Sequence, residues 1–148
     1  MRMLRSLVPF ALGAAAVLVT GAAFDNQQSD VQYIGNSRIL SRAVKVGNTL
    51  YLSGVLGTSG ERGITPETKA AMESIKTLLE ANGSHMDDVV KCTVFLADFA
   101  EWGAMNEVYT TYFTKHRPAR SAIAVNGMSG NARVEVECIA VIGARNAA

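Results

Sequence analysis

The chain has 148 residues, of which 49% are hydrophobic, and a formal net charge of +1. This length suits one domain, and the hydrophobic content is sufficient for one core. Phosphate backbones are bound by clustered Lys and Arg side chains, so a near-neutral chain without a basic run is not expected to bind nucleic acid. The two histidines, His85 and His116, have no close Cys/His spacing, and the sequence therefore indicates neither a metal site nor a cofactor.

The N-terminal residues have the layout of a secretory signal peptide. Arg2 and Arg5 precede an apolar run over residues 7–19, and small residues follow it. The run is shorter than the ~20 residues that a membrane-spanning helix needs. Cleavage after Ala22 or Ala23 is therefore predicted, with an uncleaved membrane anchor as the alternative.

This interpretation divides the chain into three parts. Residues 1–23 form the signal peptide, the polar residues 24–30 a flexible leader, and residues 31–148 the folded domain. After cleavage the protein is expected to be periplasmic or secreted, without attachment to a membrane.

The first half of the domain combines short strands with one helix. Strands are predicted over residues 39–46 and 49–53, and an additional strand, outside the main order of elements, over residues 31–34. Gly47 and Asn48 suit the tight reversal of a hairpin between the first two. Apolar residues then recur at helical spacing, which predicts a helix capped by Thr65 and ended before Gly83.

A buried strand and a second helix follow. Residues 89–96 are rich in β-branched and aromatic side chains, which predicts a strand. A helix is predicted over residues 99–115, where Pro118 ends the segment. Its broad stripe of large side chains is interpreted as core rather than as a cofactor-binding surface: Phe99, Trp102, Met105, Tyr109, Tyr112 and Phe113.

Charged residues stand inside the last two apolar strands. Arg120 shares a face of its strand with two alanines, which leaves room beside the guanidinium, and Glu135 lies in the following strand. The Gly/Asn-rich segment 126–131 predicts that these strands pair as an antiparallel hairpin. Its register is left open, since a slip of one residue would place Glu135 on the face opposite Arg120. The alternative to a functional site is a structural Arg–Glu pair.

The order of elements is thus β-β-α-β-α-β-β, which favours an α+β fold with two helices on one face of a mixed sheet. Two helices cannot cover both faces of the sheet. Because the strands supply apolar residues to both sides, the second face is expected to be buried against other copies of the chain in a homo-oligomer.

Cys92 and Cys138 form an even pair in a chain with an export signal. Each lies in an apolar strand pattern, where a buried thiol is common. The sequence leaves open whether they form a disulfide.

Five segments agree in order with one family. They are residues 46–54, 89–98, 105–109, 118–121 and 134–137. Through them the chain resembles the RidA family, also called YjgF, which older descriptions label endoribonuclease L-PSP. The resemblance implies a chorismate-mutase-like fold assembled as a homotrimer, with a cleft at each subunit interface.

The resemblance also implies roles for individual residues. Arg120 would clamp the carboxylate of a substrate, because a planar guanidinium suits bidentate binding. Glu135 would hold or activate the attacking water. The same cleft would be lined by Ser53, Gly54, Asn106 and Ser121.

The implied reaction is hydrolysis of a 2-imino acid, or its enamine tautomer, to a 2-oxo acid and ammonia. An imine carbon is already electrophilic, so a held carboxylate and a presented water suffice without a metal or a covalent nucleophile.

The chain departs from deaminase members at Leu40, Val55 and Ala122, where they usually have a tyrosine, a polar residue and a cysteine. These changes make the pocket more apolar, so a changed substrate or a low activity is expected. The alternative is an exported trimer without enzymatic activity, which binds small carboxylates or acts as a chaperone-like platform.

Overall fold

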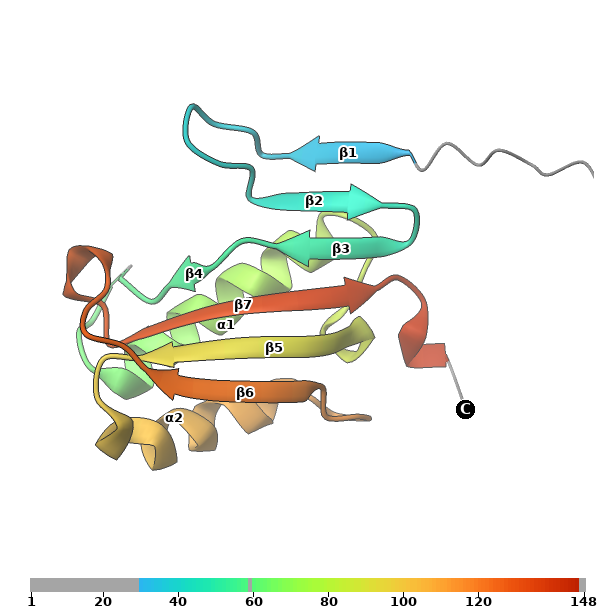
Figure 1. Ribbon diagram of the computed structural model, residues 1–148. Coiled ribbons are helices and arrows are strands. Elements are labelled where there is room, and N and C mark those ends of the chain that lie inside the picture. Colours follow the sequence, from blue (N-terminus) through green and yellow to red (C-terminus); the bar gives the residue numbers. More distant parts are fainter. Residues whose placement is uncertain (1–29, 59, 147–148) are drawn as a thin grey trace, which may run out of the picture.

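The strands of the described residues form one mixed, seven-stranded sheet (Figure 1). The computed structural model describes residues 30–58 and 60–146, so the predicted signal peptide and all but the last residue of the leader lie outside it. The strands are β1 (Val31–Ile34), β2 (Ala43–Val46), β3 (Thr49–Leu52), β4 (Val55–Leu56), β5 (Val89–Leu96), β6 (Ala119–Ala124) and β7 (Val134–Val141). Their order is β1-β2-β3-β7-β5-β6, and β4 pairs with β7. All pairings are antiparallel except that of β5 with β6.

Both helices, α1 (Ile64–Glu80) and α2 (Trp102–Tyr109), lie on one side of this sheet (Figure 1). The predicted α+β architecture is therefore confirmed. The predicted hairpin between β2 and β3 is also confirmed, with Gly47 at a φ of 55° in the turn. No helix in the described part of the chain has both the length and the apolar character to cross a bilayer.

The predicted hairpin of the last two strands is wrong, because β5 lies between β6 and β7. Cys92 of β5 pairs with Arg120 of β6 on one side and with Cys138 of β7 on the other. The connection from β5 to β6 contains α2, and such a crossover places the second strand parallel to the first. β6 thus occupies one edge of β5, and β7 pairs with the other.

α1 begins one residue before the predicted cap. Its N-cap is Gly63, at a φ of 120°, and Thr65 lies in the first turn. The Glu67 carboxylate accepts a hydrogen bond from the Gly63 N–H at 3.2 Å. Thr65 lies inside the helix, so its predicted role as the N-cap is wrong.

The second predicted helix is shorter than expected, because residues 99–101 and 110–112 form 3₁₀ turns at its two ends. Met105, Tyr109 and Phe113 are buried, as predicted. Phe99 and Trp102 are 53% and 42% exposed, so their assignment to the core is wrong. A 3₁₀ turn has about three residues per turn, and the helical stripe therefore does not continue through residues 99–101.

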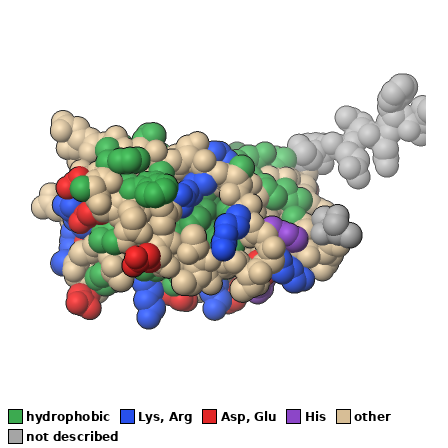
Figure 2. Space-filling model, turned by 90° about the horizontal axis from the view of Figure 1, so that it is seen from below, with side chains coloured by type: hydrophobic (Ala, Val, Ile, Leu, Met, Phe, Trp, Pro, Cys, Tyr) green, Lys and Arg blue, Asp and Glu red, His purple; other side chains and the backbone are tan. Residues whose placement is uncertain are grey.

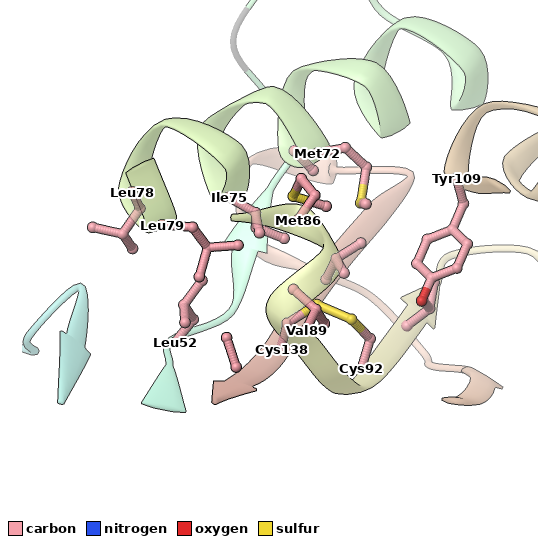
Figure 3. Packing of buried hydrophobic residues seen from close by; sticks show 14 of the residues in the cluster. Leu52, Met72, Ile75, Leu78, Leu79, Met86, Val89, Cys92, Tyr109 and Cys138 are labelled. Atoms are coloured by element: carbon pink, nitrogen blue, oxygen red, sulfur yellow. A yellow bond between two sulfur atoms is a disulfide. The ribbon is translucent and has the colours of Figure 1, made fainter. Parts of the chain in front are cut away.

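The core lies between the helices and the sheet (Figure 3). Met72, Ile75 and Leu79 of α1 pack against the side of the sheet that carries Val94 and Val136. We call this side the helix-covered face. No helix of the described residues covers the opposite, open face (Figure 1). Its burial in a homo-oligomer stays a prediction.

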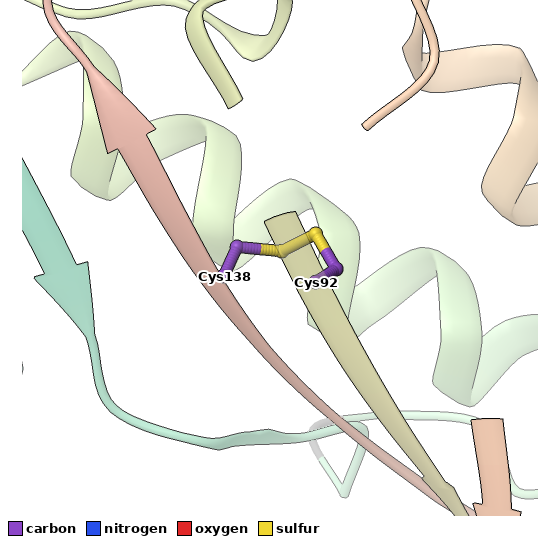
Figure 4. Close-up of a disulfide and its surroundings, with 2 residues drawn as sticks. All are labelled: Cys92 and Cys138. Carbon is purple, nitrogen blue, oxygen red and sulfur yellow. A yellow bond between two sulfur atoms is a disulfide. The ribbon is translucent and has the colours of Figure 1, made fainter. Parts of the chain in front are cut away.

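A disulfide joins Cys92 and Cys138 across β5 and β7 (Figure 4). The two residues are direct partners in the sheet register, and both are buried. The sequence left this pairing open because it depends on which strand lies beside β5.

Replacing both cysteines by alanine is expected to lower the free energy of unfolding by about 2 to 4 kcal/mol. The cross-link closes a loop between residues 46 positions apart, which restricts the unfolded chain. Urea unfolding of the parent and the double variant measures the difference, and a reductant should lower the parent's midpoint. Equal midpoints, or two titratable thiols in the denatured parent, would contradict the cross-link.

Candidate functional site

Arg120 lies on the helix-covered face, beside α2. Its register partner Cys92 has its side chain in the core, and cross-strand partners share a face. The Arg120 Nη1 atom donates a hydrogen bond to Asn106 Oδ1 at 2.6 Å. The guanidinium carbon lies 4.6 Å from the centroid of the Tyr109 ring and 5.9 Å from that of Trp102. One amide and two rings thus hold the guanidinium in place.

The positive charge of Arg120 has no carboxylate partner in the part of the chain that the structure describes. The side chain is half-buried, and Asn106 is its one hydrogen-bond partner among those residues. A guanidinium carries five N–H donors, so several stay available for an anion. Within the described residues of one protomer, Arg120 therefore forms no structural Arg–Glu pair.

Tyr109 keeps its side chain neutral beside this charge. Burial raises the pKa of Tyr109 to about 12, although the charge of Arg120 acts to lower it. The ring extends from α2 toward the sheet (Figure 3) and packs on Phe113, with ring centroids 4.9 Å apart. Its buried hydroxyl has no hydrogen-bond partner among residues 30–58 and 60–146. Tyr109 therefore positions Arg120 without neutralising it.

Glu135 lies on the open face, where its register partners are Phe95 and Leu56. Its carboxylate covers the backbone of Gly54 so closely that a Cβ atom there would lie 1.9 Å from Glu135 Oε1. Any other residue at position 54 would displace the Glu135 carboxylate from this position. Sequence reasoning placed Gly54 and Glu135 in the same cleft, and the structure does bring them together.

Ser53 holds the segment before Gly54 in place. Its hydroxyl donates to the Ser41 carbonyl at 2.7 Å, and its N–H donates to the Arg42 carbonyl at 3.0 Å. A cavity of about 230 Å³ beside this segment is lined by Leu40, Arg42, Ser53, Gly54, Val55, Leu56, Ser74 and Leu78. Glu135 lines a second cavity of about 230 Å³, together with Phe95, Val125, Gly127, Met128 and Glu137. Arg120 lines neither.

The two halves of the predicted site do not meet within one protomer. Arg120 is level with Cys138 on the helix-covered face, whereas Glu135, three residues from Cys138 in β7, points to the open face. Ser121 also points away from Arg120 and accepts a hydrogen bond from Lys91 Nζ at 3.0 Å. We call Arg120 with Asn106 the arginine half-site, and Glu135 with Ser53 and Gly54 the glutamate half-site.

Trp102 and Tyr109 are contacts of Arg120 that sequence reasoning assigned only to the core. The spacing of these residues along the helix could have predicted the two contacts. They stand four residues before and three residues after Asn106, so all three share one face of α2. Asn106 was predicted to contact the site, and its helical neighbours on the same face were therefore candidates.

A charged network around the buried Glu67 lies between the segments that carry the two half-sites. Glu67 accepts a hydrogen bond from the Arg133 N–H at 2.7 Å and forms an ion pair with Arg62, whose Nε lies 2.9 Å from Glu67 Oε1. The Arg133 side chain in turn binds Glu101, with Nε 2.9 Å from Oε2. Glu101 directly precedes Trp102, and Arg133 lies two residues before Glu135.

Metal-binding geometry is absent from the described ranges, which hold no cluster of three His, Cys, Asp or Glu side chains able to share an ion.

Comparison with known proteins gives consistent matches. The sequence model of the family described as "Endoribonuclease L-PSP" matches residues 34–142. A mouse protein named 2-iminobutanoate/2-iminopropanoate deaminase is 42% identical over 109 residues, which cover 70% of this chain and 81% of the mouse protein.

Solved structures match as well. The crystal structure of RidA from an Antarctic Psychrobacter species superposes with a TM-score of 0.68 at 34% identity, covering 76% of this chain and 98% of that one. A YjgF family member from Neisseria meningitidis superposes with a TM-score of 0.72 at 27% identity, covering 76% and 95%.

Proposed function

The chain belongs to the RidA (YjgF, endoribonuclease L-PSP) family, and from this premise we propose that it hydrolyses 2-imino acids and their enamine tautomers to 2-oxo acids and ammonia. The observation that carries the proposal is the arginine half-site: a half-buried guanidinium, oriented by Asn106, with no carboxylate partner in the described structure. Relatives named as imine deaminases support the same reaction.

The reaction follows from the chemistry of the two half-sites. Arg120 binds the substrate carboxylate through two parallel N–H donors, which fixes the imine carbon beside it. Glu135 accepts a hydrogen bond from a water and orients its oxygen toward that carbon. Water adds across the C=N bond, the nitrogen takes a proton, and ammonia leaves as the C=O bond forms. No electrons are exchanged, and one water is consumed per ammonia released.

The half-sites need a second copy of the chain to form one cleft. They lie on opposite faces of the sheet in one protomer, so Glu135 has to come to Arg120 from a neighbour. We therefore propose a homotrimer, a closed ring in which each cleft takes the arginine half-site from one copy and the glutamate half-site from the next. The uncovered apolar residues of the open face, such as Tyr51 and Ile123, support such an assembly.

Export to the periplasm or the medium is the third part of the proposal. The signal-like layout of residues 1–23 supports it. The Cys92–Cys138 disulfide supports it independently, because disulfides persist in oxidising compartments. The intact mass of the protein from a periplasmic or secreted fraction tests this step. A mass that includes residues 1–23, found only in the cytosol, would contradict it.

An amino-acid oxidase assay tests the reaction. The oxidase releases 2-imino acids from several L-amino acids, and the 2-oxo acid is measured with and without the protein. We expect faster 2-oxo acid release than from the oxidase with its spontaneous hydrolysis. No acceleration with any amino acid would overturn the proposed reaction.

A carboxylate-binding protein without turnover is the second candidate. The apolar side chains of Leu40 and Val55 in the cavity beside Ser53 and Gly54 favour it, since they supply no proton-transfer group. In that case the parent would bind 2-oxo acids, Arg120→Ala would abolish binding, and the oxidase assay would show no acceleration. A chaperone-like role would instead leave every carboxylate measurement unaffected by Arg120→Ala.

A further inference from the structure

We propose that Trp102 and Phe99 form a subsite for the substrate side chain beside Arg120, so that the protein prefers 2-imino acids with large apolar, above all aromatic, side chains. This inference rests on the proposed function and adds a substrate class to it. The experiments below separate its failure from the failure of the proposed reaction.

The two rings form one apolar wall. Their centroids lie 6.4 Å apart with an interplanar angle of 28°, which is a stacked arrangement. Phe99 and Trp102 are 53% and 42% exposed, although the aromatic stripe of which they are part is otherwise largely buried. Both rings come from the N-terminal end of α2 and the 3₁₀ turn before it, where the helix phase changes. The wall is therefore accessible to a ligand.

The wall is at the right distance from the carboxylate anchor. The Trp102 ring centroid lies 5.9 Å from the guanidinium carbon of Arg120. Each C–C bond adds about 1.5 Å to a substrate whose carboxylate binds Arg120. An isobutyl or benzyl side chain therefore extends farther toward that ring than a methyl group does.

The surroundings favour an apolar ligand group. Figure 2 shows hydrophobic side chains beside basic ones on the side of the molecule that carries α2 and β6. Ala122, on the same face of β6 as Arg120, is apolar and partly buried, so the strand adds no charge beside the guanidinium on that face. Aromatic rings bind one another in offset or tilted arrangements beyond the effect of area burial, which favours a benzyl side chain over an aliphatic one of similar size.

The chain has a built-in reporter for this contact, because Trp102 is its single tryptophan. We would titrate the parent with pyruvate, 4-methyl-2-oxopentanoate and phenylpyruvate, following tryptophan fluorescence and, for dissociation constants, calorimetry. The expected result is at least tenfold tighter binding of phenylpyruvate than of pyruvate. Equal affinities, or no binding of any of the three, would overturn the subsite. This readout needs no turnover.

Substitution then tests the assignment to the ring itself. Trp102→Ala should lower the ratio of kcat/KM for the phenylalanine-derived imine to that for the alanine-derived imine about tenfold, and Trp102→Phe should restore most of it. Tyr33→Ala, which removes an exposed ring from β1 at the opposite edge of the sheet, is the matched control and should leave the ratio as in the parent. Equal losses on both substrates in Trp102→Ala would show a structural or interface role and overturn the proposal. If the parent has no turnover, the ratio of calorimetric affinities replaces the kinetic ratio.

Discussion

Replacing Arg120 by lysine is expected to lower kcat/KM for 2-imino acid hydrolysis about a hundredfold, and replacement by alanine further. Lysine keeps the charge but loses the planar pair of N–H donors and the hydrogen bond to Asn106 Oδ1. Hydrogen bonds to charged groups contribute about 1.5 to 3 kcal/mol, and each 1.36 kcal/mol corresponds to a factor of ten in rate. A loss of about 3 kcal/mol therefore gives the expected hundredfold effect.

The oxidase assay at varied substrate concentrations measures this change. If Arg120 binds the carboxylate in the ground state, the lower kcat/KM should come largely from a higher KM. Arg38→Lys is the matched control, since Arg38 is an exposed arginine in the loop before β2. It should have the kinetic constants of the parent. If Arg120→Lys has the same kcat/KM as Arg38→Lys, Arg120 does not bind the substrate.

Replacing Glu67 by alanine is expected to lower the free energy of unfolding by about 3 to 5 kcal/mol. The carboxylate is fully buried, accepts hydrogen bonds from the Gly63 and Arg133 N–H groups, and forms an ion pair with the partly exposed Arg62. Its removal leaves two backbone N–H groups without an acceptor, and hydrogen bonds to a charged group contribute about 1.5 to 3 kcal/mol each.

Urea unfolding at neutral pH measures the effect of Glu67→Ala. Glu80→Gln is the matched control, because Glu80 is an exposed glutamate at the end of the same helix. Its free energy of unfolding should stay within a few tenths of a kcal/mol of that of the parent, as is usual for surface substitutions. If Glu67→Ala is as stable as Glu80→Gln, the contacts of Glu67 with the segment before α1 and with Arg133 do not stabilise the fold.

Local patterns predicted most of the fold. Each predicted strand and helix lies close to its place, because alternation, helical spacing and turn residues such as Gly47 act over a few residues. The two-residue strand β4 was not predicted, and the strand predicted over residues 39–46 begins only at Ala43. The pairing of β6 with β5 instead of β7 depends on the crossover through α2, which no local pattern contains. The same non-local arrangement decides that Cys92 faces Cys138, so the disulfide could not be derived from the sequence alone.

The candidate site was predictable in composition but not in arrangement. Arg120 with Asn106, and Glu135 with Gly54, were each expected in one cleft, and the structure brings the members of each pair together. The strand periodicity left open which face Glu135 occupies, because that depends on the pairing of β7. The exposure of Phe99 was missed because helical periodicity was carried through the 3₁₀ turn of residues 99–101.

Subunit mixing tests most directly whether the site is built from two copies of the chain. Arg120→Ala and Glu135→Gln are each expected to be nearly inactive. In random trimers from an equal mixture, an intact cleft needs Arg120 from a Glu135→Gln copy and Glu135 from its Arg120→Ala neighbour. Closed-ring geometry then gives roughly a quarter of the parent activity after co-refolding. No recovery above the separately refolded variants would contradict a cleft shared between copies.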